Sequence, residues 1–196
     1  MTAPSRVPSP AGTMSDAQTW LCDTSVYTHL ARAGYLDLLR QVSPNGTIYV
    51  PPTVSREIDA ALDLYSDIPA VSDVRWARMV TLTDDEDWTS AFVKADLGGV
   101  GHQNLGESEL IACAVHRGWI ALMDDRAATT IAARKGVRTH DTLWVVVEAC
   151  STLPGKSWAW GETVVDDLLA TGMWLPVLSG RDLFAWADEQ GLVQRD

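Results

Sequence analysis

The sequence predicts an α/β fold, a three-layer sandwich in which a central parallel sheet of about four or five strands lies between helices. Two observations indicate it. Short runs that are apolar throughout alternate along the chain with longer stretches of helical periodicity. Strands without polar alternation are typical of parallel sheets that are buried on both faces. The intervening helices then serve as crossover connections, which are right-handed in nearly all known cases.

The candidate elements follow one another in regular order. The strands are predicted at 19–23, 47–51, 78–82, 119–123 and 136–139. The helices are predicted at 25–41, 53–64, 86–95, 106–117, 126–135 and 141–152. Residues 64–104 carry turn-rich stretches around one strand and one helix. Beyond residue 153, the stretch LPGKSWAWGE predicts a loop, and two further helices follow at about 161–171 and 180–190, separated by Gly172 and Pro176.

The chain of 196 residues has the length of one domain with an appendage. Residues 1–18 are rich in Pro, Ser, Ala and Thr and lack the apolar segment of a secretory signal, so we expect a disordered tail. Residues 19–152 are expected to form the domain. Residues 153–196 are expected to form a helical pair packed on it, because they are too few to fold alone.

Composition narrows the class of protein. A net charge of −11 argues against a protein that coats nucleic acid non-specifically, but it leaves room for a nucleic-acid enzyme with a local basic patch and bound metal ions. No apolar run reaches 18 residues, so we expect no membrane span. The three cysteines stand singly in apolar runs without metal-ligand spacing, which indicates reduced core thiols in a cytoplasmic protein.

Acidic residues follow the candidate strands or open the next helices. They are Asp23, Asp124 and Asp125 at strand ends, and Glu57, Glu107 and Glu109 in first helical turns. Ligands of parallel sheets bind beyond the carboxyl ends of the strands, and these acids share one rim if the first and fourth strands are neighbours. Each acid alone also fits a helix cap or a first-turn charge, including a capping box of Asn104 with Glu107. Together they would repel one another unless a hard cation such as Mg²⁺ or Mn²⁺ lies among them.

Other side chains are ambiguous. In the basic cluster of Arg126, Arg134, Lys135 and Arg138, Arg126 is the better phosphate ligand, while Arg134 and Lys135 suit a helix C-terminus. The four histidines make no zinc pattern. Trp144, Trp174 and Trp186 lie in apolar patterns and are expected in the core or an interface. Trp158 and Trp160 either stack on bases or pack a loop onto the body.

Four stretches of the chain, taken together, resemble PIN-domain nucleases, the fold of VapC-type toxins. They are LCDTSVYTHLARAGYLDLL, IYVPPTVSREI, LGESELIACAVHRGWIALMDDRAATTIAARKGV and DTLWVVVEAC. The resemblance covers roughly residues 19–152 and is to prokaryotic PIN relatives with LGxGE-like and DDR-like motifs. The C-terminal stretch VVDDLLATGMWLPVLSGRDLFAWADEQG also resembles the tail of that group.

The resemblance implies Mg²⁺- or Mn²⁺-dependent hydrolysis of phosphodiester bonds, usually in RNA. By motif, the four catalytic acids are Asp23, Glu57, Glu107 and Asp125. The implied metal ligands are Asp23, Glu107, Asp125 and Asp124, with Glu109 as a possible outer ligand. Ser25 and Arg126 are the implied substrate-binding residues. Asp141 departs from the family, which has a Gly-Thr turn there, and it either adds a ligand or, as we favour, caps the next helix.

The resemblance also implies partners. The chain would act on RNA in the cytoplasm, and the family's roles include a toxin covered by an antitoxin segment and a homodimer. The alternative is a PIN-fold binding module that is inactive as a nuclease and recognises a protein partner. The acidic charge and the tryptophan-rich tail favour that alternative, whereas the four matching acids disfavour it.

Overall fold

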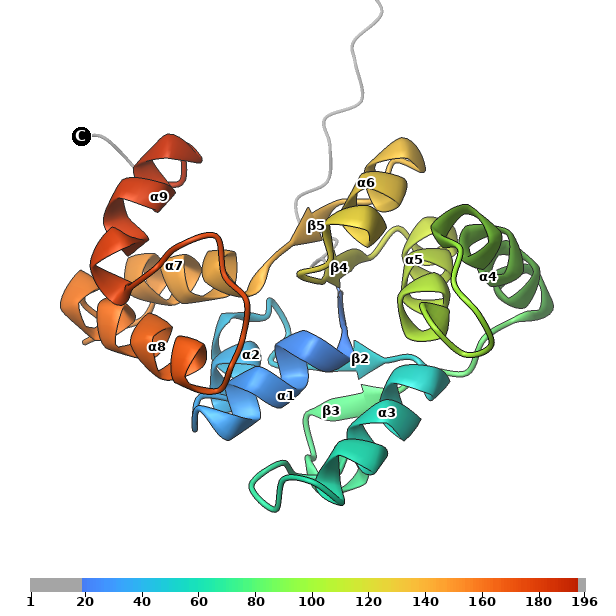
Figure 1. Ribbon diagram of the computed structural model, residues 1–196, viewed down its shortest axis with the longest axis horizontal. Coiled ribbons are helices and arrows are strands. Elements are labelled where there is room, and N and C mark those ends of the chain that lie inside the picture. Colours follow the sequence, from blue (N-terminus) through green and yellow to red (C-terminus); the bar gives the residue numbers. More distant parts are fainter. Residues whose placement is uncertain (1–18, 194–196) are drawn as a thin grey trace, which may run out of the picture.

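The computed structural model describes residues 19–193, in which a five-stranded parallel sheet lies between helical layers (Figure 1). The strand order is β3-β2-β1-β4-β5. The strands are β1 (Trp20–Cys22), β2 (Ile48–Val50), β3 (Ala77–Met79), β4 (Ile120–Leu122) and β5 (Thr139–His140). The predicted α/β/α fold is therefore confirmed. The first and fourth strands are neighbours, which is the condition under which the acids share one rim. The expected tail, 1–18, lies outside the described residues.

Each central strand is buried on both faces, which is why its sequence lacks polar alternation. Trp20 and Cys22 of β1 face one hydrophobic core, and Leu21 between them faces the other. The same division holds in β4, where Ile120 and Leu122 face the first core and Ala121 faces the second. The period of two residues along each strand thus divides one apolar run between two cores.

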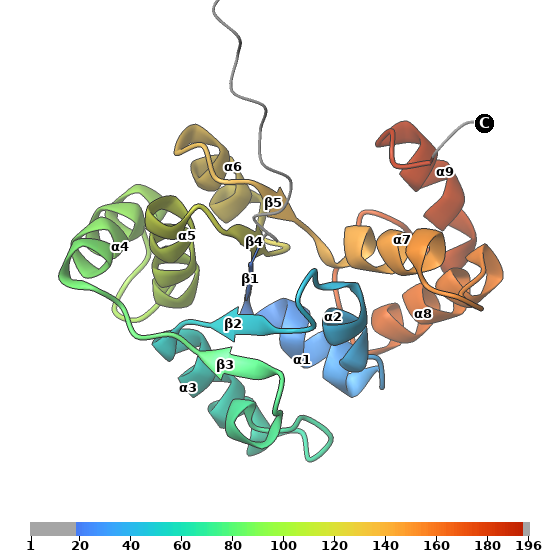
Figure 2. The same cartoon turned by 180° about the vertical axis from the view of Figure 1, so that it is seen from behind.

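The helices divide between the two faces of the sheet, as Figures 1 and 2 show from opposite sides. On one face lie α1 (Thr24–Arg32), α2 (Asp37–Val42), α7 (Thr142–Thr152), α8 (Trp158–Ala170) and α9 (Leu183–Glu189). On the other lie α4 (Asp84–Leu97), α5 (Leu105–Arg117) and α6 (Arg126–Arg134). Helix α3 (Pro52–Leu62) contacts both α1 and α5. Short 3-10 turns occur at η1 (Val71–Asp73) and η2 (Gly180–Asp182).

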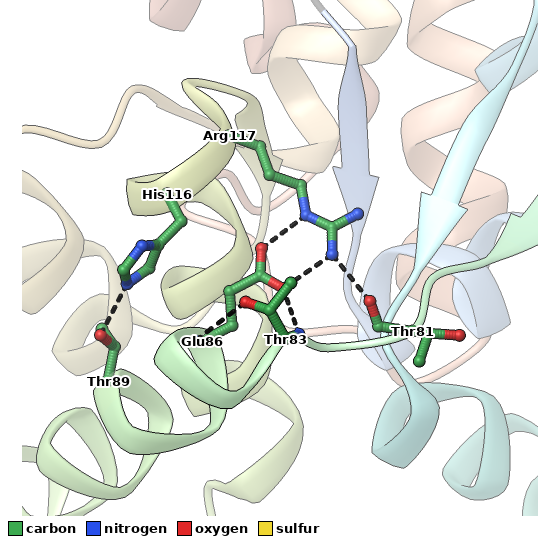
Figure 3. Close-up of polar contacts among 6 residues, drawn as sticks. All are labelled: Thr81, Thr83, Glu86, Thr89, His116 and Arg117. Carbon is green, nitrogen blue, oxygen red and sulfur yellow. Dashed lines mark hydrogen bonds and ion pairs between the residues drawn. The ribbon is translucent and has the colours of Figure 1, made fainter.

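A partly buried ion pair joins α4 to α5 (Figure 3). Arg117 donates from Nε to Glu86 Oε1 at 2.5 Å, and from Nη2 to Glu86 Oε2 at 2.7 Å and to the Thr81 carbonyl at 2.8 Å. Glu86 also accepts from the Thr83 amide and completes the capping box that begins α4. The paired guanidinium lowers the pKa of Glu86. The second helical layer is therefore joined by a bidentate charge pair as well as by its apolar core.

Three predicted elements differ from the structure. The single helix predicted at 25–41 is two helices, because Gly34 adopts a φ of +80° that ends α1. The amide of Tyr35 donates to the Leu30 carbonyl and closes that helix end. The last strand begins at Thr139 rather than at 136, because Gly136 has a φ of +74° in the turn after α6.

The loop predicted around Trp158 and Trp160 is the third difference. Helix α8 begins at Trp158, and the Ser157 hydroxyl caps it by accepting from the Trp160 amide at 3.2 Å. Trp158 packs edge-to-face on Phe184, and Trp160 packs in the same way on Tyr35. Packing, and not base stacking, is the role the structure gives these two side chains.

The C-terminal helices share the core of the first layer. Val164, Val165 and Leu168 of α8 and Leu183 of α9 are fully buried there against α7. All three cysteines are free, with Cys22 and Cys113 buried and Cys150 half-buried. Across the described residues, no helix combines the length and the apolar character that a membrane crossing requires.

Candidate functional site

A cleft of about 530 Å³ opens at the carboxyl ends of β1 and β4. From β1, the sheet grows through β2 and β3 in one direction and through β4 and β5 in the other. This reversal of strand order is the place where parallel α/β sheets bind ligands. The lining combines acids with one cation and a C-terminal segment: Asp23, Ser25, His29, Glu107, Asp124, Asp125, Arg126, Met173 and Trp174.

Asp23 follows β1 and caps α1. Its backbone is extended, and its amide donates to the Leu122 carbonyl of β4 at 3.0 Å, which fixes the residue between the two central strands. Its Oδ2 accepts from the Ser25 hydroxyl at 2.9 Å. The side chain is only 5% exposed, and burial raises the pKa of Asp23 to about 6. The charged form is therefore disfavoured unless a cation compensates it.

Asp124 lies beside Asp23 at the end of β4. Its Oδ1 accepts from the Thr142 amide and its Oδ2 from the Thr142 hydroxyl, both at 2.9 Å. Burial raises the pKa of Asp124 to about 6. The Ser25 hydroxyl, bonded to Asp23, is also 3.5 Å from Asp124 Oδ2, so one small side chain lies between the two carboxylates.

Glu107 and Asp125 complete the acidic lining. Asp125 caps α6, where its Oδ1 accepts from the Ala128 amide at 2.7 Å. Burial raises the pKa of Glu107, and the charges of Asp23 and Asp125 raise it further. The capping box considered for Asn104 and Glu107 is absent, because Asn104 has a φ of +59° and makes no side-chain cap bond. Helix capping therefore does not explain Glu107.

Glu57 and Glu109 do not line the cleft. Glu57 accepts from the Thr24 hydroxyl at 2.5 Å, and burial, followed by the charges of Glu107 and Glu109, raises its pKa. It lies behind the start of α5, where a Cβ on Gly106 would be 3.0 Å from its Oε2. Glu109 accepts from the Thr53 amide at 2.8 Å and from the Thr53 hydroxyl at 2.5 Å. Both of its oxygens thus hold the start of α3.

Asp141 caps α7, as we favoured from the sequence. Its Oδ1 accepts from the Trp144 amide at 2.7 Å. The residue is therefore accounted for by the helix that it begins.

Only Arg126 of the basic cluster lines the cleft. Its guanidinium carbon is 4.5 Å from the centroid of the Trp174 ring. Lys135, at the end of α6, pairs with Asp96 at 3.4 Å, and Arg134 and Arg138 are exposed elsewhere. Arg126 is therefore the member of the cluster that lies beside the acids, and its role as a phosphate ligand stays a prediction.

The donors in the cleft fit a hard cation. Carboxylate and hydroxyl oxygens are the ligands of Mg²⁺ and Mn²⁺, and Mg²⁺ commonly keeps several waters while it binds one or two carboxylates. Within 19–193, no group of three or more His, Cys, Asp or Glu side chains is arranged to hold a metal ion. The geometry therefore suits a hydrated ion on Asp23 and one neighbouring acid better than a closed cage.

Three lining residues were missed from the sequence. His29 of α1 bonds through Nδ1 to the Thr171 hydroxyl at 2.6 Å, and Met173 and Trp174 follow α8. Trp174 was expected in the core or an interface. Its side chain is 63% exposed, so it does not lie in the core, and the interface stays a prediction. Trp144 and Trp186, in contrast, pack against the core as expected. The resemblance of the C-terminal stretch to the tail of the PIN relatives was the available signal.

Comparison with known proteins identifies a family. The chain matches the family described as a PIN domain over residues 19–179, a range that includes every acid in the cleft and also the segment that carries Trp174. No curated protein and no solved structure matches the chain.

Proposed function

The chain belongs to the PIN-domain family, whose fold is that of nucleases, and from this we propose that it is a Mg²⁺- or Mn²⁺-dependent endoribonuclease. One observation carries the proposal. Asp23, Glu107, Asp124 and Asp125 line one cleft, and among the described residues none of them forms a salt bridge with Lys, Arg or His. Several carboxylates in one cleft, none of them paired with the cation Arg126 in the described part of the chain, favour the binding of an external cation.

The proposed roles follow from the contacts. Asp23 and one neighbouring acid would hold the metal directly, and the remaining acids among Glu107, Asp124 and Asp125 would bind it through its waters. Ser25 and Thr142 fix Asp23 and Asp124 in place. A bound Mg²⁺ or Mn²⁺ would supply an activated water and would offset the phosphate charge in the transition state. Arg126 would bind a phosphate oxygen through its guanidinium. Glu57 would act from the edge of the site, through its hydrogen bond to Thr24.

The biological setting is part of the proposal. We place the protein in the cytoplasm, as the possible toxin of a toxin–antitoxin pair, with an antitoxin segment or a second copy as its partner. We also propose that residues 19–152 form the domain that carries the acids and that 153–196 form an extension packed on it, which completes the wall of the cleft. The family matched over 19–179 supports the nuclease fold of this arrangement.

A binding module without nuclease activity is the second candidate. Helix α4 favours it, because Trp88 and Phe92 lie one turn apart and are 70% and 66% exposed. Melting the protein with and without Mn²⁺ separates the two candidates. An intact metal site raises the melting temperature by mass action, and Asp23→Asn removes that rise, whereas a binding module shows no rise in either protein.

Cleavage of RNA is the direct test. Single-stranded and structured RNAs are incubated with Mn²⁺ and with the wild type, Asp23→Asn or Asp125→Asn. Asp63→Asn is the matched control, because Asp63 is an exposed acid at the end of α3. Cleavage that is lost in both site variants and kept in the control supports the proposal. Equal background in all four proteins would reject it.

A further inference from the structure

Trp174 is the largest side chain that lines the acidic cleft, and none of the roles proposed above uses it. It lies between α8 and η2, and its indole is 63% exposed. A single exposed apolar residue is ordinary on a protein surface. The position of Trp174 is not ordinary, because it lines the same cleft as four carboxylates.

The backbone that carries Trp174 is fixed on both sides. Met173, Leu175 and Val177 are buried, so alternate residues of the segment anchor it while Trp174 points outward. At the end of α8, the Thr171 hydroxyl bonds to His29 and to the Leu168 carbonyl. At the other end, the Gly180 amide donates to Asp166 at 2.6 Å. The indole is therefore presented by an ordered support, which lowers the entropic cost of binding a ligand to it.

Arg126 extends this surface toward the acids. It follows Asp125 directly, and its guanidinium lies over the Trp174 ring with 4.5 Å between the Arg126 Cζ and the ring centroid. Within the described part of the chain, no carboxylate forms an ion pair with Arg126. A guanidinium that lies over a ring and pairs with no carboxylate has N–H groups that can bind a phosphate oxygen.

The order acid, guanidinium and indole matches the repeat of a nucleic-acid strand, in which phosphates alternate with bases. We propose that Trp174 stacks on an unpaired base next to the scissile phosphate, while Arg126 binds the neighbouring phosphate. This inference rests on the proposed nuclease function. A base inside a duplex has neighbours on both faces and is not free to stack on a protein ring. The base that Trp174 holds is therefore unpaired.

The stacking of a base on Trp174 is tested by measuring RNA binding. Fluorescence anisotropy follows the binding of a fluorescein-labelled single-stranded RNA, with Ca²⁺ in place of Mg²⁺ or Mn²⁺ so that cleavage does not interfere. Trp174→Leu keeps an apolar side chain but removes the ring, and it is expected to weaken binding by about five- to a hundred-fold. Trp174→Phe is expected to keep most of the affinity. Trp88→Leu, at an equally exposed tryptophan on α4, is expected to change nothing.

An RNA series with one abasic position at a time locates the stacked base. Removing the base at one position of the RNA is expected to weaken its binding to the wild type. The same abasic RNA should bind Trp174→Leu as well as the intact RNA does. If Trp174→Leu binds the RNA with full affinity, or if Trp88→Leu loses as much affinity as Trp174→Leu, the proposed stacking on Trp174 is overturned. The nuclease proposal fails separately. If the wild type shows the abasic pattern but never cleaves RNA, the stacking proposal stands and the nuclease proposal fails. If it cleaves RNA and Trp174→Leu binds as tightly as the wild type, only the nuclease proposal stands.

Discussion

Asp23 meets two demands that need different chemistry. As the cap of α1 it needs only a side-chain oxygen, which Asn would supply equally well. As a buried group beside Asp124 it carries a charge that the protein must accommodate. A carboxylate where an amide would suffice for folding indicates a role beyond folding.

The metal-free protein is therefore expected to lose stability as the pH rises. Burial raises the pKa of Asp23 to about 6, above its value in the unfolded chain, so the folded state holds the proton more tightly. This contribution is present below about pH 4 and is lost as the pH rises through 6, and Asp124 acts in the same direction. Asp23→Asn keeps the cap and cannot ionise. At pH 7.5 the free energy of unfolding of Asp23→Asn should be about 1–3 kcal/mol higher than that of the wild type.

Urea unfolding in EDTA at pH 5 and pH 7.5 measures this difference. Asp63→Asn, at an exposed acid, serves as the control and should follow the wild type at both pH values. If Asp23→Asn is instead less stable than wild type at pH 7.5, the carboxylate is compensated within the protein and the case for an external cation weakens.

The acids of the cleft could be identified from the sequence alone. The four cleft acids follow strand ends or begin helices, and such positions are visible in the hydrophobic pattern. The place of Trp174 in the cleft could not be predicted, because its neighbours in sequence are apolar and only the fold shows which of them point inward. Its contact with Arg126 joins segments that are far apart in the chain, and no local pattern reports such a pair.

At the scale of elements, strand and helix types were predictable but their ends were not. The Gly34 turn that divides the predicted helix 25–41 depends on a left-handed glycine, and glycine is also tolerated within helices. The start of α8 depends on the Ser157 cap in a stretch whose Pro and Gly suggested a longer loop. Cap geometry competes with composition at such positions, and here it prevailed.

Helix α8 crosses α7 and α9 closely at Gly161. A Cβ at this position would be 2.6 Å from Cys150 Sγ and 2.9 Å from Leu183 Cδ2. Alanine in a helix is otherwise favoured over glycine by about 1 kcal/mol. The overlap should outweigh that preference, so Gly161→Ala is expected to lower the free energy of unfolding by about 1–2 kcal/mol.

Chemical denaturation of Gly161→Ala, Cys150→Ala and the double variant measures the overlap. Removing Sγ should make Gly161→Ala less costly in the double variant than it is alone, which gives a favourable coupling between the two sites. A stabilised Gly161→Ala would show that helix propensity decides at this position and that the two helices are not in tight contact.

At the scale of the whole molecule, the topology determines where the chemistry lies. The strand order β3-β2-β1-β4-β5 brings Asp23 and Asp124 together although about half of the chain separates them. The net charge of −11 would repel RNA elsewhere on the surface. Binding would then depend on the cleft, where Arg126 and a bound metal offset the charge, so we expect little non-specific affinity for nucleic acid.

Truncation after residue 152 tests whether the C-terminal helices belong to the fold. It removes Val164, Val165, Leu168 and Leu183 from the core that they share with α7. Fully burying side chains of this size contributes about 1.5–3 kcal/mol each, and their sum is comparable to the 5–15 kcal/mol by which domains are typically stable. The cleft also loses the Met173 and Trp174 wall. The truncated chain is therefore expected to be largely unfolded or aggregated, and the full chain to melt in a single transition.

Circular dichroism and calorimetry of both chains give the answer. A folded truncated chain that melts within a few degrees of the full chain would make 153–196 an appendage that can be removed. Loss of the fold would show that α8 and α9, and with them the segment that carries Trp174, belong to the same cooperative unit as the rest of the domain. In that case a substitution in α8 that loosens the packing should also weaken RNA binding, because the ring and the acids are held by the same core.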